Sequence, residues 1–273
     1  MEKKIVQTKT FAGLANVNVE LTSRCNKDCW MCGRRERDKL YKDMAYGDMD
    51  FALVEKIASE LPPGIVIQLH NNGEPLLYPK FKEVVTLFKK RNFITNIVTN
   101  GELLVEKSQE IIGILDTLSI SVFENDRRAD MQLKIIKEFI KLKGENSPFT
   151  TLRFVGRVDE AKYADIRILK IKRLLHSPKG SFDYKRKDPT IPEIGICLDF
   201  LNHLAIDRNG DVSVCVRFDP NRELVLGNVR NESLLDLWNC RKRQNMLALH
   251  VAGQRNKIPF CSKCHFWGVP TGE

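Results

Sequence analysis

Three cysteines crowded into eight residues constrain this chain more than any other feature. Cys25, Cys29 and Cys32 are spaced C-x3-C-x2-C. Structural zinc sites draw cysteine pairs from two knuckles and close all four coordination positions. A compact trio can instead hold three irons of a cubane cluster and leave the fourth iron open, an arrangement that suits soft thiolates. The spacing therefore favours an iron–sulfur cluster, with three buried cysteines or part of a zinc knuckle as the alternatives.

Strands and helices alternate along the first two thirds of the chain. Alternating polar and apolar residues predict strands over 15–21, 64–70, 93–98, 117–122, 150–158 and 181–185. Apolar residues at helical spacing predict helices between them, over 51–60, 80–91, 103–114, 128–143 and 161–175. This order implies a parallel sheet with right-handed crossovers. We predict an α/β fold, a partial (β/α)6 barrel over residues 15–187.

The cysteine trio comes directly after the first predicted strand, and the second strand ends in Asn72-Gly73-Glu74-Pro75. These two motifs resemble the cysteine loop and the Gly-Gly-Glu-Pro motif of radical S-adenosylmethionine (radical SAM) enzymes, with Asn72 in place of the first glycine. The resemblance implies a [4Fe–4S] cluster on Cys25, Cys29 and Cys32, whose free iron chelates SAM. In that family the reduced cluster cleaves SAM to a 5′-deoxyadenosyl radical, which takes a hydrogen atom from the substrate.

The same resemblance implies further SAM-binding positions. Family members carry an aromatic residue just before the third cysteine, near the adenine; here Met31 stands at that position and Trp30 precedes it. Gly73 permits close backbone approach, and the Glu74 carboxylate can accept hydrogen bonds from the ammonium group of SAM. The remaining expected contacts are Pro75, Asn100, Ser119 and Ser121. Ordinary strand serines are the alternative for the last two.

A second set of cysteines lies in the last third of the chain. Proline and glycine punctuate residues 188–195 as in a linker, and we predict a β-hairpin over 203–216 and a helix over 233–250. Four cysteines flank these elements: Cys197, Cys215, Cys261 and Cys264. Their order resembles the twitch appendage of radical SAM enzymes, a truncated SPASM domain with one auxiliary [4Fe–4S] cluster. We therefore predict a small iron–sulfur domain over 188–273, with a structural zinc site as the alternative; Cys240 is predicted to be a free thiol.

Composition limits the classes of protein to which this chain can belong. Of the 273 residues 42% are hydrophobic and 29% charged, as in an ordinary globular enzyme, and no apolar run has the length of a membrane span. The first residues lack a signal peptide's apolar core, so we expect a cytoplasmic protein whose eight cysteines bind metal rather than form disulfides. The net charge of +9 raises the alternative of nucleic-acid binding, but no basic motif with interleaved aromatic residues supports it. The charge instead favours an anionic substrate.

An auxiliary cluster with four protein ligands has no open iron, so its expected chemistry is electron transfer. The resemblance implies an oxidoreductase of the 2-deoxy-scyllo-inosamine dehydrogenase type, acting on a small polar metabolite such as a sugar, cyclitol or nucleotide, with flavodoxin or ferredoxin as electron donor. Arg153, Tyr184 and Arg186 are candidate substrate contacts. The alternatives are a peptide- or protein-modifying radical SAM enzyme and a non-catalytic iron–sulfur or nucleic-acid-binding protein.

Overall fold

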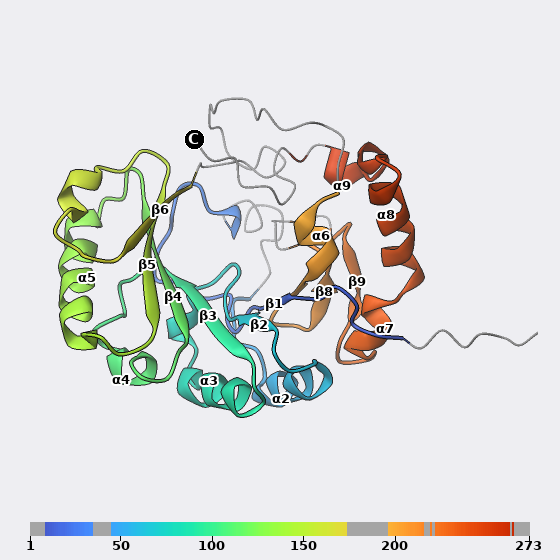
Figure 1. The fold of residues 1–273 in the computed structure, drawn as a ribbon, viewed down its shortest axis with the longest axis horizontal. Helices are drawn as coiled ribbons and strands as arrows, with labels where there is room; N and C mark the ends of the chain where they lie inside the picture. The colour runs from blue at the N-terminus through green and yellow to red at the C-terminus, as the bar shows by residue number, and fades with distance from the viewer. Residues whose placement is uncertain are drawn as a thin grey trace, which may run out of the picture.

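The computed structural model describes residues 9–34, 45–173, 196–215, 219, 222–262 and 264, and in these residues the strands form one nine-stranded sheet. The spatial order is β6-β5-β4-β3-β2-β1-β7-β8-β9, drawn as a curved array in Figure 1. The strands are β1 (Asn16–Val19), β2 (Val66–Gln68), β3 (Ile94–Thr99), β4 (Thr117–Phe123), β5 (Phe149–Val155), β6 (Leu169–Arg173), β7 (His203–Ile206), β8 (Asp211–Ser213) and β9 (Val225–Asn228). Every pair from β6 to β7 is parallel, which confirms the predicted α/β barrel-type sheet.

Helices cover the outer face of this sheet (Figure 1). They are α2 (Phe51–Glu60), α3 (Phe81–Lys90), α4 (Ser108–Ile111) and α5 (Ala129–Lys143). The helix expected over 51–60 forms as predicted, and its N-cap Asp50 accepts a hydrogen bond from the backbone N–H of Ala52 at 3.1 Å. The helix expected over 103–114 shortens to α4 because turns occupy the residues before it.

The predicted helix over 161–175 is wrong. Residues Glu160–Tyr163 form a short 3₁₀ turn, η2, and Leu169–Arg173 form strand β6. The segment Leu169-Lys170-Ile171-Lys172 alternates with a period of two, and its backbone pairs in parallel with β5. Pairing with the sheet therefore decides the structure of this segment against its helical composition. The strand expected over 181–185 lies outside the described residues.

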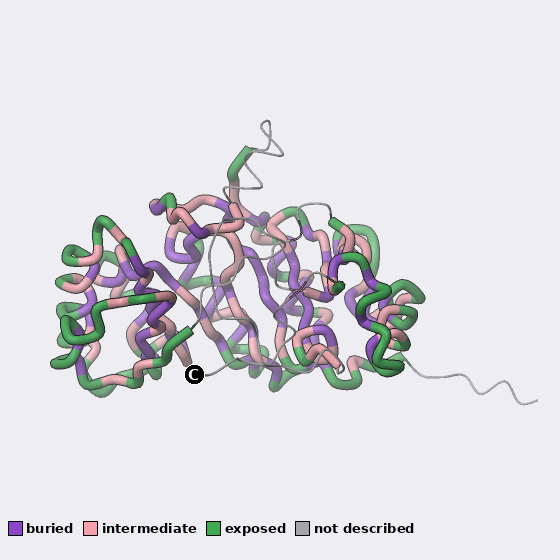
Figure 2. The backbone as a smooth tube through the Cα atoms, turned by 90° about the horizontal axis from the view of Figure 1, so that it is seen from above, coloured by how far each residue is buried: buried purple, intermediate pink, exposed green. Residues whose placement is uncertain are grey.

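The two faces of the sheet differ in polarity. Alternate residues of the central strands, such as Val17, Ile67 and Ile120, are fully buried against the outer helices, whose core includes Phe81 and Phe88. The opposite face carries polar side chains at matching register positions: Asn18, Gln68, Asn96, Ser119, Ser121, Thr151 and Arg153. Figure 2 shows that buried residues concentrate in the middle of the molecule and that exposed residues concentrate at its periphery. The inner face of the sheet is thus a polar surface.

The predicted hairpin forms, since β7 and β8 pair antiparallel, and it continues the nine-stranded sheet. Strand β7 pairs in parallel with β1, with Asn16 opposite His203, and β8 and β9 follow antiparallel. The helices here are α6 (Leu198–Asn202), α7 (Leu234–Trp238), α8 (Arg241–Val251) and α9 (Pro259–Ser262), with the 3₁₀ turn η4 (Arg255–Lys257). The helix predicted over 233–250 is therefore broken in two at Asn239 and Cys240.

The predicted domain boundary between residues 187 and 188 lies outside the described residues. Within the described ranges, none of the helices has both the length and the apolar character needed to cross a bilayer.

Candidate functional site

The cysteine trio lies on the loop that leaves the carboxyl end of β1. All three thiols are partly exposed and none is in a disulfide. The loop turns tightly, since the backbone N–H of Cys32 donates to the carbonyl of Cys29 at 3.0 Å and the N–H of Lys27 donates to Cys25 Sγ at 3.4 Å. Burial, and then the neighbouring Cys32, raise the pKa of Cys29 to about 12. The thiols are thus close enough to interact electrostatically, and metal binding must displace their protons.

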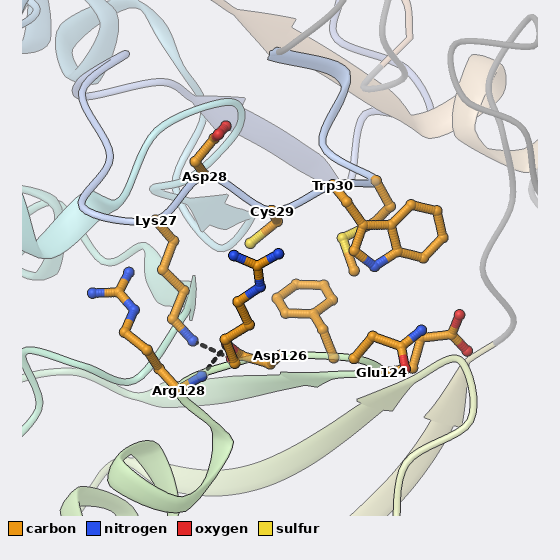
Figure 3. Close-up of a pocket in the computed structure, with 11 residues that line it drawn as sticks. Lys27, Asp28, Cys29, Trp30, Glu124, Asp126 and Arg128 are labelled. Carbon is orange, nitrogen blue, oxygen red and sulfur yellow. Dashed lines mark hydrogen bonds and ion pairs between the residues drawn. The ribbon is translucent and has the colours of Figure 1, made fainter.

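A buried charge network fixes this loop to the loop that follows β4. Lys27 is 5% exposed, and its Nζ lies 2.5 Å from Asp126 Oδ2 and 3.5 Å from Glu102 Oε1. Figure 3 shows Lys27 and Arg128 converging on Asp126. Arg128 Nε also lies 3.0 Å from Glu102 Oε1. Burial alone would raise the pKa of Asp126, but the hydrogen bonds from Lys27 and from the Arg128 backbone lower it. No pattern in the sequence predicts this network.

Gly73 packs directly on the start of the cysteine loop. A Cβ atom at this position would lie 2.0 Å from the carbonyl oxygen of Thr22 and 2.8 Å from that of Arg24. The next residue, Glu74, donates its backbone N–H to the same Arg24 carbonyl at 2.8 Å. Only glycine fits here, because both close atoms belong to the backbone. The second motif therefore holds the base of the first.

The Glu74 carboxylate is buried and fixes the end of β3. It accepts hydrogen bonds from the Thr99 hydroxyl at 2.8 Å and from the Asn100 N–H at 2.9 Å. Burial raises its pKa to about 7, against the effect of these bonds. Asn100 in turn donates to Asn26 Oδ1 at 2.7 Å and to Cys25 Sγ at 3.9 Å. Glu74 and Asn100, both expected SAM contacts, thus meet beside the first cysteine, and Pro75 begins the 3₁₀ turn η1 (Pro75–Leu77) that follows Glu74.

The other expected SAM positions lie on β4 and at the third cysteine. Ser119 shares a hydrogen bond with Thr151 at 3.0 Å, whereas the buried Ser121 hydroxyl has no hydrogen-bond partner among the described residues. Met31 is 8% exposed and packs against Val155. Together with Cys29 and Trp30 it lines a pocket of about 920 Å³ between the cysteine loop and the loop after β4, drawn in Figure 3.

Arg153 is the one candidate substrate contact within the described residues; Tyr184 and Arg186 lie outside them. It stands on β5 opposite Ser121. Burial lowers the pKa of His70, which follows β2, and the neighbouring Arg153, His203 and Arg173 add to this effect, so that the pKa is about 3. The polar inner face therefore collects positive charge next to the expected SAM positions.

A second cavity brings together all four cysteines predicted for the C-terminal site. Besides these cysteines it is lined by Asp199, Phe200, Val214, Leu224, His250, Arg255 and Phe260. Three separate segments supply Cys197, Cys215 and the Cys261–Cys264 pair. Cys240 is not in the lining and instead serves as the N-cap residue of α8. His250 and Arg255 were missed from the sequence, because their spacing to the cysteines carries no recognisable pattern.

Both cysteine sites fall inside segments that match known protein families. Residues 19–146 match the radical SAM superfamily, and residues 197–265 match SPASM, an iron–sulfur cluster-binding domain. The chain is a radical SAM enzyme with a SPASM domain.

Relatives of this radical SAM enzyme span its whole length. It is 25% identical to the S-adenosyl-L-methionine-dependent 2-deoxy-scyllo-inosamine dehydrogenase of Niallia circulans, over 94% of this chain and 95% of that protein. Its fold resembles the crystal structure of BtrN in complex with AdoMet and 2-DOIA (TM-score 0.63, 19% identity, 92% of each chain). It also resembles Streptococcus suis SuiB bound to the precursor peptide SuiA (TM-score 0.67, 15% identity, 86% of this chain and 67% of that one).

The residues of this radical SAM enzyme fit the cofactors that its two domains imply: SAM with a [4Fe–4S] cluster, and an auxiliary iron–sulfur cluster. The close backbone approach at Gly73 borders the three-thiol loop. The orphaned Ser121 hydroxyl belongs to a residue that Gln132 connects to Asn100, since Gln132 Nε2 donates to the carbonyls of both. The second cavity offers four soft donors. Among the described residues no three His, Cys, Asp or Glu side chains lie as close together as the ligands of one ion. In a cubane, by contrast, each thiolate binds a different iron.

Proposed function

We propose that this enzyme oxidises a small polar metabolite, with Cys25, Cys29 and Cys32 holding the SAM-binding cluster. The auxiliary cluster is assigned to the four thiols of the second cavity: Cys197, Cys215, Cys261 and Cys264. When bound, SAM on its cluster supplies a 5′-deoxyadenosyl radical, and the auxiliary cluster accepts the electron left after hydrogen abstraction and proton loss.

The gathering of four thiols in one cavity is the observation that carries this proposal. Four protein thiolates satisfy all four irons of a cubane, so no iron is left to bind a substrate. A closed cluster in a protein interior suits one-electron transfer, and an enzyme that ends its reaction with a substrate radical needs such an acceptor when the product is oxidised. The whole-length similarity to a dehydrogenase supports the same assignment.

The inner face of the sheet supports a polar, anionic substrate. Side chains that face the barrel interior pair with one another across strands, as Asn96 does with Thr117 at 2.7 Å. Arg153 and Arg173 stand at the carboxyl ends of β5 and β6, beside His70. An apolar substrate would leave these groups unsolvated, whereas a sugar, cyclitol or nucleotide-like molecule with an acidic group can bind them. We assign Arg153 to the substrate.

The chain's own residues position SAM in this proposal. Gly73 brings the backbone to the base of the cysteine loop, and Glu74 and Asn100 lie beside Cys25. Ser121 has hydrogen-bonding capacity to offer, and Ser119 offers a hydroxyl already shared with Thr151. Met31 and Pro75 are assigned to the walls of the SAM site. The Lys27 network holds the loop in place so that the thiols keep their spacing.

The first cluster needs an external low-potential electron, which we assign to a flavodoxin or ferredoxin. None of the eight cysteines is in a disulfide, which is typical of a reducing compartment, and we place the enzyme in the cytoplasm. Peptide modification is the second candidate, because SuiB, whose structure contains a precursor peptide, shares the fold.

The test separates radical formation from substrate oxidation. In the double variant Cys261→Ala, Cys264→Ala, iron should fall from about eight to about four per chain. Cleavage of SAM to 5′-deoxyadenosine should continue while the oxidised product from a metabolite extract disappears. Cys240→Ala is the matched control and should keep both activities. A circular-dichroism melt must show that the double variant is folded. Undiminished oxidation in a folded double variant would contradict the proposal, and modification of a peptide instead of a metabolite would favour the second candidate.

A further inference from the structure

One histidine faces the second cavity and touches its cysteines on both sides. His250 lies on α8, is 1% exposed, and stacks on Phe200 with ring centroids 4.5 Å apart. Its Nε2 lies 3.9 Å from Cys261 Sγ, and its Nδ1 lies 3.5 Å from the backbone nitrogen of Cys197. The ring therefore bridges two of the chain segments that supply thiols.

These two contacts fix where the ring carries its proton. A backbone N–H can only donate, so Nδ1 must accept the hydrogen bond from Cys197 and carries no proton. In a neutral imidazole the proton then resides on Nε2, the atom that points at Cys261 Sγ. Nε2–H is thus a donor directed at a cysteine sulfur.

A cationic side chain, Arg255, binds the backbone of Cys261 and of the neighbouring Cys264. Arg255 is 9% exposed, and its Nη1 donates to the carbonyl of Cys261 at 2.5 Å and to that of Cys264 at 3.3 Å. These bonds fix the turn between the two cysteines. The permanent charge of a guanidinium also favours the addition of an electron nearby.

We propose that His250 donates an N–H···S hydrogen bond to the Cys261 thiolate and thereby raises the reduction potential of the auxiliary cluster, making it a better electron acceptor. Hydrogen bonds to cluster sulfurs withdraw electron density from the ligand and stabilise the reduced state. His250 is a positioning and tuning residue rather than a catalytic one. The inference rests on the proposed function only in that the four cysteines of this cavity hold a cluster.

Two amide substitutions of His250 separate the roles of the two ring nitrogens, Nδ1 and Nε2. The Asn oxygen can take the place of Nδ1 and keep the bond from Cys197, so His250→Asn loses only the donor to sulfur. The longer Gln can place an N–H near the position of Nε2, so His250→Gln keeps that donor. The measured quantity is the midpoint potential of the auxiliary cluster in the full-length reconstituted enzyme. Reduction of this cluster is monitored through the EPR signal that SAM does not perturb.

His250→Asn should make reduction of the auxiliary cluster about tenfold less favourable, which is 59 mV for a one-electron couple. His250→Gln should stay within about threefold of the unmodified enzyme. An unchanged potential in His250→Asn, or an equal fall in both variants, would overturn the inference while leaving the proposed function intact. Iron near four per chain in the unmodified enzyme would overturn the proposed function and this inference with it.

The unmodified enzyme offers a measurement that does not depend on a variant assembling its cluster. With ¹⁵N-labelled histidine, pulsed EPR of the auxiliary cluster should show hyperfine coupling to one histidine nitrogen across the N–H···S bond. Transfer to D₂O should replace the bridging proton, since it is exchangeable. Absence of any coupling to a histidine nitrogen would overturn the inference.

Discussion

The two cysteine sites of this enzyme are built in opposite ways. Cys25, Cys29 and Cys32 lie within eight residues on the loop that follows β1. Buried ion pairs of Lys27 connect this loop to Asp126 and Glu102. The four cysteines of the second site come from three segments spread over 197–264 and meet only because β8, α6 and α9 pack around one small cavity. The first is a local motif anchored by charges, and the second is a product of the tertiary fold.

This difference predicts different sensitivities. A local loop keeps its ligand spacing as long as its anchor holds, so the first site should fail through loss of a thiol or of the Lys27 network. The second site has no thiols in position until distant segments pack, so its metal binding and its folding should be coupled. Four changes, taken from the largest expected effect to the smallest, test this contrast.

Replacing one thiol of the loop should give the largest effect. Cys29→Ala should abolish 5′-deoxyadenosine formation, because a cubane held by two thiolates is not retained, and iron should fall to about four per chain. The C-terminal cavity should still fill, since it shares no ligand with the loop. Iron quantification and liquid chromatography of the SAM products measure both effects. Loss of all iron would show that the two sites assemble together and would contradict the independence of the two sites.

Removing the anchor of the loop should cost several kcal/mol without touching a ligand. Lys27→Met removes the cation that binds the buried Asp126 carboxylate, and breaking a buried pair in this way costs about 3–5 kcal/mol in free energy of unfolding. Glu102 keeps its contact with Arg128. Urea denaturation of the iron-free chain measures the loss. The matched control is Lys89→Met: the Lys89 side chain is 38% exposed, against 3% for Lys27, so its pair with Asp116 should contribute about 0–1 kcal/mol. Equal losses in the two variants would show that the Lys27 pair is no anchor.

A buried histidine in each domain, His70 and His250, should make the free energy of unfolding decrease in acid. The pKa of His70 is about 3 and that of His250 about 4, both below the usual value of 6.5. The unfolded chain therefore binds these protons first, so each neutral histidine contributes stability that is complete above pH 6.5 and is lost as the pH falls towards its folded pKa.

Stability of the iron-free chain should therefore decrease below pH 6.5 by up to about 1.4 kcal/mol per pH unit for each histidine. His70→Gln should flatten that decrease by one proton, and His70→Gln combined with His250→Gln by two. Urea unfolding at pH 7, 6 and 5 gives the slopes. A slope in His70→Gln as steep as that of the unmodified chain would disprove the contribution of His70.

The smallest effect is expected for the eighth cysteine. Cys240 caps α8 without a side-chain hydrogen bond and lies outside the second cavity. Cys240→Ala should leave iron at about eight per chain and change the free energy of unfolding by less than about 0.5 kcal/mol. Iron quantification and urea denaturation are sufficient to test it. A loss of half the iron would mean that the second site draws on Cys240, and the ligand set assigned to that cavity would be wrong.

Features of this protein that have a local cause could be predicted from the sequence. Thiol spacing within eight residues indicates cluster chemistry without reference to the fold, and the alternation of strands and helices placed β1, α2, β3 and β4 because side-chain periodicity follows from backbone geometry. The order of the four later cysteines indicated a second site through its resemblance to the twitch appendage.

Features that depend on distant partners arise when the chain folds and could not be predicted from local patterns. Residues Leu169–Arg173 became a strand because β5 offers a free edge, against a composition that also fits a helix. The pairing of β7 with β1 is a contact between residues nearly two hundred positions apart, which no local pattern encodes. Lys27 and His250 look like ordinary surface residues in the sequence. They acquire their roles because folding buries them against Asp126 and Cys261, and burial makes such polar contacts strong.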